Sequence, residues 1–314
     1  MSRTRTVTVA DTRFLVREHE GPGRPVLLLH GVPETSSMWS ELAPRIAATG
    51  RRVLAPDLPG LGGSAYTGPY DPASVVAQLA ALVTAETSGP IDVVGHDWGG
   101  SLALGLAGAH PELVRRLAVL NAPYREVPLL RAAHIPLLAL PVLPELAFRA
   151  GGRHIVDAML SIGWKAGHQL DPDRRAEYHA AYTDPARVSA MLGYYRGAAR
   201  PRLRAMLPGQ PTPAGPPRVT AERTLVVWGS ADPVLPVSVA EGIARDLGPE
   251  CVVVTIPGAG HFVVEEAPEV VASTLLDFLG DPAGGPAAEG APTPAPKAST
   301  STRAPRAPRK KPAA

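Results

Sequence analysis

The sequence has little of several features, and each shortage excludes a class of protein or site. Cys251 is the one cysteine in 314 residues, which excludes an intramolecular disulfide and a metal site built from several thiolates. Residues 1–14 are basic but hold no continuous apolar run, so no secretory signal is expected there. The most apolar stretch, Ile135 to Phe148, contains three prolines and is too short to cross a bilayer. We therefore expect a cytoplasmic protein with no transmembrane segment.

Large hydrophobic residues are missing from the end of the chain. Residues 281–314 contain eight prolines and no aromatic or large aliphatic side chain, so they cannot bury a core and should be disordered. Six Lys and Arg against two acids give this tail a charge of +4, which leaves about −2 for the rest of a chain of net charge +2. The tail could contact anionic lipid or nucleic acid, but we expect an inert extension, and the predicted function requires no nucleic acid.

Apolar runs and helical patterns alternate over most of the remaining chain. Strands are expected at residues 5–10, 13–19, 25–30, 52–57, 91–94, 116–121, 224–228 and 251–256, and helices at 39–48, 72–86, 101–109, 237–247 and 268–279. This alternation predicts an α/β fold, with a mostly parallel sheet covered by helices on both faces. Between Pro123 and Pro217 only helical patches and prolines occur, which indicates a helical lid inserted after the sixth strand.

The predicted domain organisation follows from these boundaries. Residues 1–124 and 220–280 form the two parts of the core, residues 125–219 form the helical cap or lid, and residues 281–314 form the tail. Residues 210–217, with four prolines, are expected to be the linker out of the lid.

The segment from Val93 to Gly100 reads VVGHDWGG and joins a predicted strand to a predicted helix. Gly95 and Gly99 allow the two elements to approach closely, which lets Asp97 adopt a strained conformation with its side chain at the end of the sheet. This is the nucleophile-elbow pattern G-x-Nuc-x-G, with aspartate in place of serine. Taken alone, Asp97 could equally be a turn former or a helix N-cap.

An aspartate nucleophile favours chemistry at a saturated carbon. A serine attacking such a carbon would leave an ether, which water does not readily cleave. A carboxylate leaves an alkyl ester instead, and water can open that ester at the carbonyl carbon of the aspartate. Asp97 is also ionised at neutral pH, because the reference pKa of aspartate is about 3.9. The residue therefore predicts displacement of a leaving group followed by ester hydrolysis, with no cofactor and no metal.

Candidate partners of Asp97 follow other predicted strands. Asp232 comes after the strand 224–228, and His261 lies in a glycine-containing loop after the strand 251–256. Ligands meet open α/β sheets at this carboxyl edge, and the order nucleophile, acid, histidine is that of an elbow hydrolase. We interpret the three residues as a catalytic triad. The structural alternative makes Asp232 a turn former and His261 an ordinary loop residue.

An oxyanion hole is predicted from two backbone N–H groups. The run His30 to Pro33 ends an earlier strand that we expect to lie beside the elbow strand, which brings the N–H of Val32 near Asp97. The N–H of Trp98 is the second donor. Together they would stabilise the negative oxygen that forms when water attacks the ester.

These motifs resemble the α/β-hydrolase superfamily, and within it the epoxide hydrolase and haloalkane dehalogenase branch. The resemblance rests on HGVP at 30–33, DLPGLGGS at 57–64, GHDWGG at 95–100, Asp232 and the loop GAGH at 258–261. It covers about residues 5–280, apart from much of the lid. It implies the α/β-hydrolase fold and a small apolar organic substrate that reacts with water. The run HGVPE at 30–34 and His96 next to Asp97 are closer to epoxide hydrolases, which open epoxides to vicinal diols.

The resemblance also implies a proton donor in the lid. The run Leu192 to Arg196 resembles the Tyr-Arg lid motif of epoxide hydrolases, which gives Tyr195 the role of acid and substrate contact. The family has a second lid tyrosine, expected here near residues 134–139, and none is present. Tyr178 or Tyr182 could replace it, and both could instead be packing residues.

Two alternatives remain open on sequence alone. Haloalkane dehalogenases share the triad and bind the halide with the tryptophan that follows the nucleophile, here Trp98, and in some members with a lid tryptophan, for which Trp164 is the candidate. Trp164 could equally be a packing residue. A non-catalytic small-molecule receptor is the third reading, which the complete triad disfavours. The sequence does not predict the oligomeric state.

Overall fold

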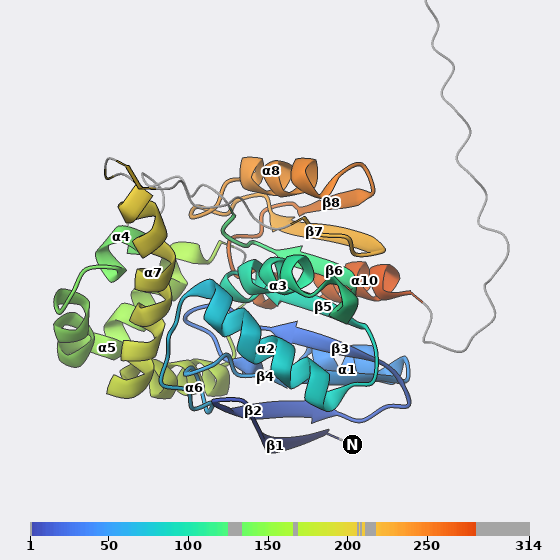
Figure 1. Ribbon diagram of the computed structural model, residues 1–314, viewed down its shortest axis with the longest axis horizontal. Helices are drawn as coiled ribbons and strands as arrows, with labels where there is room; N and C mark the ends of the chain where they lie inside the picture. The colour runs from blue at the N-terminus through green and yellow to red at the C-terminus, as the bar shows by residue number, and fades with distance from the viewer. Residues whose placement is uncertain are drawn as a thin grey trace, which may run out of the picture. The chain divides into compact units, whose positions relative to one another are not determined.

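The computed structural model describes residues 2–124, 134–165, 169–205, 207, 209–210 and 218–280. The tail at residues 281–314 lies outside the described residues, and so does most of the predicted linker 210–217. The described part contains one eight-stranded sheet with helices packed against it (Figure 1).

The sheet has the strand order β1-β2-β4-β3-β5-β6-β7-β8. β1 and β2 are antiparallel to each other, β2 is antiparallel to β4, and the remaining neighbours are parallel. The bounds are β1 Ser2–Val9, β2 Thr12–His19, β3 Gly23–Leu29, β4 Arg51–Pro56, β5 Ile91–His96, β6 Val114–Leu120, β7 Arg223–Gly229 and β8 Cys251–Ile256. The predicted mostly parallel sheet is therefore confirmed, with every strand end within three residues of its expected position.

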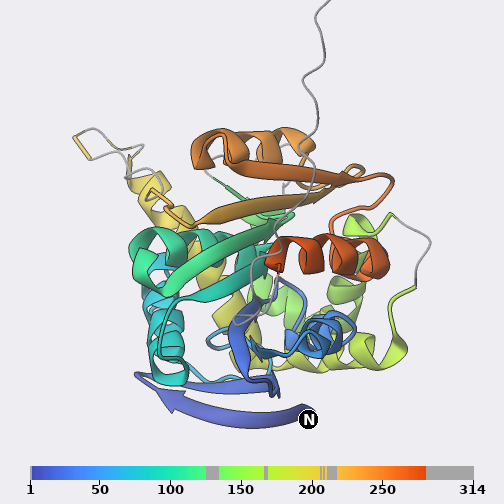
Figure 2. The ribbon, with the colours of Figure 1, turned by 90° about the vertical axis from the view of Figure 1, so that its right-hand side faces the viewer.

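Helices cover both faces of the sheet, as Figure 2 shows with α2 and α3 on one side and α1 and α10 on the other. The core helices are α1 Leu42–Ala48, α2 Pro72–Glu86, α3 Trp98–Ala109, α8 Val237–Leu247, α9 Val263–Glu266 and α10 Pro268–Leu279, with 3-10 turns at η1 Ser36–Trp39 and η2 Pro111–Leu113. The helix expected over 39–48 starts only at Leu42, after η1. The helix expected from Ser101 starts three residues earlier, because Asp97 is its N-cap.

Among the described residues, four helices form an insertion between β6 and β7. They are α4 His134–Leu138, α5 Leu143–Gly163, α6 Pro172–Thr183 and α7 Pro185–Ala205. Figure 1 shows them gathered beside the carboxyl ends of the parallel strands. The insertion therefore lies at the edge of the sheet where the predicted site residues are found.

The two longest described helices, α5 and α7, have 21 residues each. Neither they nor any other described helix combines the length and the hydropathy that crossing a bilayer requires. The location of the protein in the cell stays a prediction from the sequence.

Candidate active site

Asp97 lies in the turn between β5 and α3. Its backbone has φ 48° and ψ −119°, a conformation that is strained for a residue with a side chain. Glycines make the turn possible. A Cβ on Gly95 would lie 2.3 Å from the carbonyl oxygen of Gly99, and one on Gly99 would lie 2.3 Å from that of Leu29. The elbow conformation expected from the sequence is therefore present at Asp97.

Strand pairing brings the loop after β3 to the Asp97 carboxylate. Because β3 is the parallel neighbour of β5, the chain leaving Leu29 runs beside the elbow. The Val32 N–H donates to Oδ2 of Asp97 at 3.0 Å. Gly31 permits this approach, since a Cβ there would lie 2.6 Å from the Cβ of Asp97. The other predicted donor, the N–H of Trp98, is in the first turn of α3, where backbone N–H groups have no acceptor within the helix.

His261 and Asp232 meet at the carboxyl edge of the sheet, on the loops after β8 and β7. Nδ1 of His261 lies 2.9 Å from Oδ2 of Asp232, and Nε2 lies 3.7 Å from Oδ1 of Asp97. Asp232 is held in place because its Oδ1 accepts hydrogen bonds from the backbone N–H groups of Val234 and Leu235 at 2.7 and 2.9 Å. The structure thus brings together the three residues that the sequence analysis grouped.

Asn121 is a site residue that sequence reasoning missed. It follows β6 with a positive φ of 37°, and its Nδ2 donates to Oδ2 of Asp232 at 2.7 Å. Its Oδ1 accepts from the backbone N–H of Gly229 at 3.1 Å, which ties the end of β6 to the end of β7. The position at the end of a predicted strand was the one signal that could have identified it.

Tyr195 on α7 is a buried tyrosine next to Asp97. Its ring makes an edge-on contact with Trp98, with centroids 5.2 Å apart. Burial, and then the negative charge of Asp97, raise the pKa of Tyr195 well above its ordinary value, so its hydroxyl remains protonated. Helix α7 therefore places a phenolic O–H donor within the electrostatic reach of the predicted nucleophile.

The other tyrosines of the insertion have hydroxyl partners elsewhere. Tyr178 donates to Oε1 of Glu265 at 3.0 Å, and Tyr182 donates to the carbonyl oxygen of Glu34 at 2.8 Å. Tyr194 donates to the carbonyl oxygen of Pro59 at 2.8 Å. In this arrangement Tyr178 and Tyr182 join the insertion to the core, which is the packing alternative of the sequence analysis.

Comparison with known proteins decides the family. A model described as "Alpha/beta hydrolase family" matches residues 26–274. The chain belongs to the alpha/beta hydrolase family. The fold, the superfamily and the hydrolase class expected from the sequence are thereby confirmed.

Three individual similarities extend over most of the chain. Epoxide hydrolase A of Mycobacterium tuberculosis is 28% identical, over 88% of this chain and 96% of that protein. The AB hydrolase superfamily protein YfhM of Bacillus subtilis is 27% identical, over 82% of this chain and 90% of its own length. A solved structure from a study of epoxide hydrolases in metagenomes from hot environments aligns with a TM-score of 0.74 at 27% identity, over 89% of this chain and 99% of that one.

The charges in the site of this hydrolase determine which groups are ionised. Burial lowers the pKa of His261, but the Asp232 and Asp97 carboxylates outweigh it and raise the pKa to about 10. Burial raises the pKa of Asp97, but the hydrogen bond and charge of His261, the charge of His96 and the N–H of Val32 together outweigh it, and the net shift is downward. In the resting site both aspartates are therefore carboxylates and His261 is an imidazolium at neutral pH.

This ionisation couples the site to folding stability. The folded-state pKa of His261, about 10, lies above its ordinary value of 6.5. A group shifted in this direction contributes stability that is fully present below pH 6.5 and is lost as the pH rises toward 10, since the unfolded chain gives up its proton first.

A buried ion pair underlies the elbow. Nδ1 of His96 lies 2.7 Å from Oε2 of Glu34, and Nε2 of His96 lies 2.9 Å from the carbonyl oxygen of His261. Both partners are acceptors, so both ring nitrogens must donate, which requires the imidazolium form. In keeping with this, burial lowers the pKa of His96, but the charge of Glu34, its hydrogen bond and the charge of Asp97 together outweigh burial, and the net shift of the pKa is upward. The network fixes the backbone of His261 relative to the elbow.

Trp164 ends α5 and is half-buried. Its ring packs on Phe262, with centroids 5.9 Å apart. The preceding residue, Gly163, accepts a hydrogen bond from the N–H of His261 at 2.9 Å. The predicted halide-binding tryptophan is therefore near the histidine loop, where it has a packing contact.

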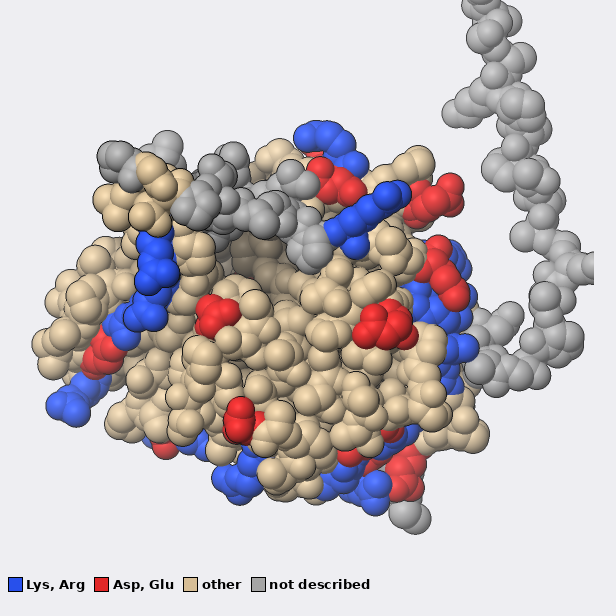
Figure 3. Space-filling view, in the orientation of Figure 1, with Lys and Arg blue, Asp and Glu red and all other residues tan. Residues whose placement is uncertain are grey.

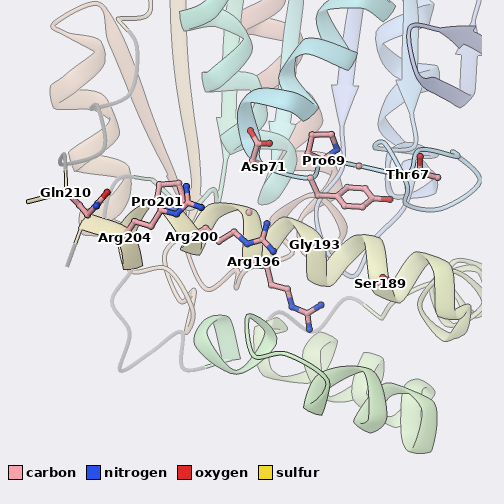
Figure 4. Close-up of a pocket in the computed structure, with 13 residues that line it drawn as sticks. Thr67, Pro69, Asp71, Ser189, Gly193, Arg196, Arg200, Pro201, Arg204 and Gln210 are labelled. Atoms are coloured by element: carbon pink, nitrogen blue, oxygen red, sulfur yellow. The ribbon is translucent and has the colours of Figure 1, made fainter. Parts of the chain in front are cut away.

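A pocket of about 990 Å³ opens between α7 and the loop before α2. Figure 4 shows Arg196, Arg200 and Arg204 along its α7 wall, with Asp71 on the other side. Tyr70 lines this pocket and stacks on Tyr194, with centroids 5.7 Å apart. Asp97, Tyr195 and His261 are not among the residues that line it.

The shared charges predict a measurable coupling between His261 and Asp97. In the Asp97→Asn variant the pKa of His261 should fall below its wild-type value of about 10, because one of the two carboxylates that raise it is gone. Side-chain NMR of labelled histidine would follow the titration, with prompt measurement because the amide can hydrolyse. Asp157→Asn, which alters a carboxylate in the insertion bound to His179, is the control and should leave the pKa of His261 unchanged. An unaltered pKa in Asp97→Asn would contradict the charge assignment.

Proposed function

We propose that this hydrolase opens epoxides to vicinal diols through a covalent ester on Asp97. One observation carries the proposal, namely that the two oxygens of the Asp97 carboxylate have different partners. Oδ2 accepts from the N–H of Val32 at 3.0 Å, while Oδ1 faces Nε2 of His261 at 3.7 Å. The similarity to proteins named epoxide hydrolases supports the same activity.

In the first half-reaction, Oδ1 of Asp97 attacks one carbon of the epoxide. The carbon–oxygen bond breaks, and its electron pair goes to the epoxide oxygen, which takes the proton of the Tyr195 hydroxyl. An alkoxide is a stronger base than a phenolate, so this transfer is favourable even though the pKa of Tyr195 is raised. The product is an alkyl ester whose carbonyl oxygen is Oδ2, held by the N–H of Val32.

In the second half-reaction, water attacks the ester carbonyl carbon and gives a proton to Nε2 of His261. The negative oxygen that forms on Oδ2 is stabilised by the N–H groups of Val32 and Trp98. Collapse releases the diol oxygen, which takes the proton from His261, and the new carboxyl group of Asp97 gives its proton to His261, which restores the resting charges. Asp232 orients the imidazole and stabilises its charged form.

Esterification also prepares the base. Once Asp97 carries the alkyl group its negative charge is gone, so two of the interactions that raise the pKa of His261 are lost. The pKa of His261 then falls, and the proton that its imidazolium releases is taken up by the Tyr195 phenolate. The neutral imidazole can therefore accept a proton at the stage when water must be activated. The charge on the nucleophile thus sets the order of the two steps.

The insertion acts as the lid in this proposal, over residues 125–219 between core parts 1–124 and 220–280. Its helix α7 supplies Tyr195, and Gly163 at the end of α5 contacts the backbone of His261. The proposed substrate is a small apolar epoxide and the second reactant is water. Substrate contacts are assigned to Tyr195 and Trp98.

A test of the two-step scheme separates the half-reactions. His261→Gln should still be alkylated, because Asp97 is ionised without a base, but should not hydrolyse the ester. We expect a covalent adduct of one substrate mass on the peptide that contains Asp97, measured by mass spectrometry after incubation with styrene oxide. Asp97→Ala, treated identically, is the control and should acquire none. Bound substrate with no adduct in His261→Gln would contradict the scheme.

A second test distinguishes an epoxide from a halide leaving group. Loss of the Tyr195 hydroxyl in Tyr195→Phe should slow alkylation by styrene oxide roughly 10²–10⁴-fold, the usual effect of removing a positioned acid. Trp164→Phe should leave diol formation unchanged, because this ring packs on Phe262. Single-turnover rates of both variants with styrene oxide and with a bromoalkane would measure these effects. Bromide release that depends on Trp164, with diol formation unaffected by Tyr195→Phe, would favour a dehalogenase instead.

A further inference from the structure

Exposed large hydrophobic residues gather in the helical insertion. Of the eleven found among the described residues, eight lie in α4 to α7 or just after α7, and three lie in β8 and α10. Seven of the eight belong to two short segments, which we name the apolar tip: Leu137, Leu140, Val142, Leu143 and Leu146 in residues 137–146, and Leu203 and Leu207 in residues 203–207. An exposed cluster of this kind marks an interaction surface.

The two segments of the apolar tip belong to neighbouring elements. Arg196 on α7 donates to the carbonyl oxygen of Leu140 and forms an ion pair with Glu145 at 2.6 Å. Leu143 and Leu203 are 60% exposed each, so these side chains remain in solvent despite that contact. The described structure thus leaves a large apolar area uncovered at the end of the insertion.

Arginines without a carboxylate partner accompany the leucines. Arg149 and Arg153 follow Leu146 on the outward face of α5, and Arg200 and Arg204 flank Leu203 on α7. Among the described residues none of these four forms an ion pair, whereas Arg196 is neutralised by Glu145. Figure 3 shows a line of mostly basic side chains that begins over α7 and, past one acidic side chain, ends over α5, beside a surface largely free of charge.

The chain as a whole has a matching charge asymmetry. Residues 125–219 carry thirteen Lys and Arg against seven Asp and Glu, whereas residues 1–124 and 220–280 together carry twelve against twenty. The insertion is therefore at +6 and the core at −8. Near a negatively charged surface such a molecule turns its insertion toward that surface and its core away.

We propose that the insertion docks through the apolar tip onto a bilayer that contains anionic lipids. The leucines enter the boundary between headgroups and acyl chains, while the four arginines contact lipid phosphates. Long arginine side chains suit this position, since their stems pack on apolar surface while their guanidinium groups stay in water. A second copy of this chain fits less well, because joining two tips would bring together two surfaces of the same positive sign. The inference does not depend on the proposed reaction.

Co-sedimentation with vesicles tests the docking, using the full chain so that the tail is the same in every variant. We expect binding to phosphatidylcholine vesicles that contain phosphatidylglycerol, weaker binding as salt rises, and little binding to phosphatidylcholine alone. Arg200→Gln with Arg204→Gln should weaken binding by about 25-fold, at about fivefold for each arginine. Leu143→Ser with Leu146→Ser should weaken it by at least about tenfold.

Val252→Ser with Val253→Ser is the matched control, because these two valines are exposed on β8, which lies on the other side of the ribbon from α4 and α5 (Figure 1). It should bind as the wild type does. Thermal unfolding of all variants shows whether each has folded. If the leucine and arginine variants bind the vesicles as strongly as the wild type does, the tail accounts for the affinity and the proposal is overturned. So would absence of vesicle binding together with a dimer, seen by light scattering, that Leu143→Ser with Leu146→Ser dissociates.

Discussion

The strained turn at Asp97 is the constraint on which the rest of the site depends. A carboxylate can be presented beyond the end of β5 only if β5, α3 and the chain leaving β3 approach more closely than side chains allow. Gly95, Gly99 and Gly31 make that possible, since a Cβ at any of them would lie within 2.6 Å of another atom. The close approach brings the N–H of Val32 to Oδ2 of Asp97, so the turn that exposes the proposed nucleophile also brings it a hydrogen-bond donor.

The two carboxylates of the site differ in their hydrogen-bond partners and are therefore suited to different roles. Asp97 and Asp232 are both carboxylates beside one imidazole. Asp232 accepts hydrogen bonds from Asn121 and two backbone N–H groups, whereas Oδ1 of Asp97 faces Nε2 of His261 at 3.7 Å. The first is therefore suited to hold the imidazole, and the second to react. Tyr195 remains neutral beside them because burial and the Asp97 charge both oppose its ionisation.

The strands of the fold and the grouping of Asp97, Asp232 and His261 could be predicted from the sequence, because the elbow and the two partner loops are local patterns at the ends of strongly apolar strands. Asn121 could not, since its contact with Asp232 depends on the pairing of β6 with β7 and on a positive φ. The alternatives at Tyr178 and Tyr182 likewise needed the packing of the insertion on the core, where their hydroxyls find Glu265 and Glu34. Local sequence fixes strands and turns, whereas contacts between distant helices require the folded chain.

The central claim is that Asp97 becomes covalently bound to the substrate and that water attacks the aspartate and not the epoxide. The most direct measurement is a single turnover of an epoxide in oxygen-18-labelled water with the enzyme in excess, followed by mass spectrometry of the diol and of the peptide that contains Asp97. The covalent route predicts one heavy oxygen in the Asp97 carboxylate and an unlabelled diol. A labelled diol with unlabelled Asp97 would mean that water opens the epoxide directly, and would contradict it.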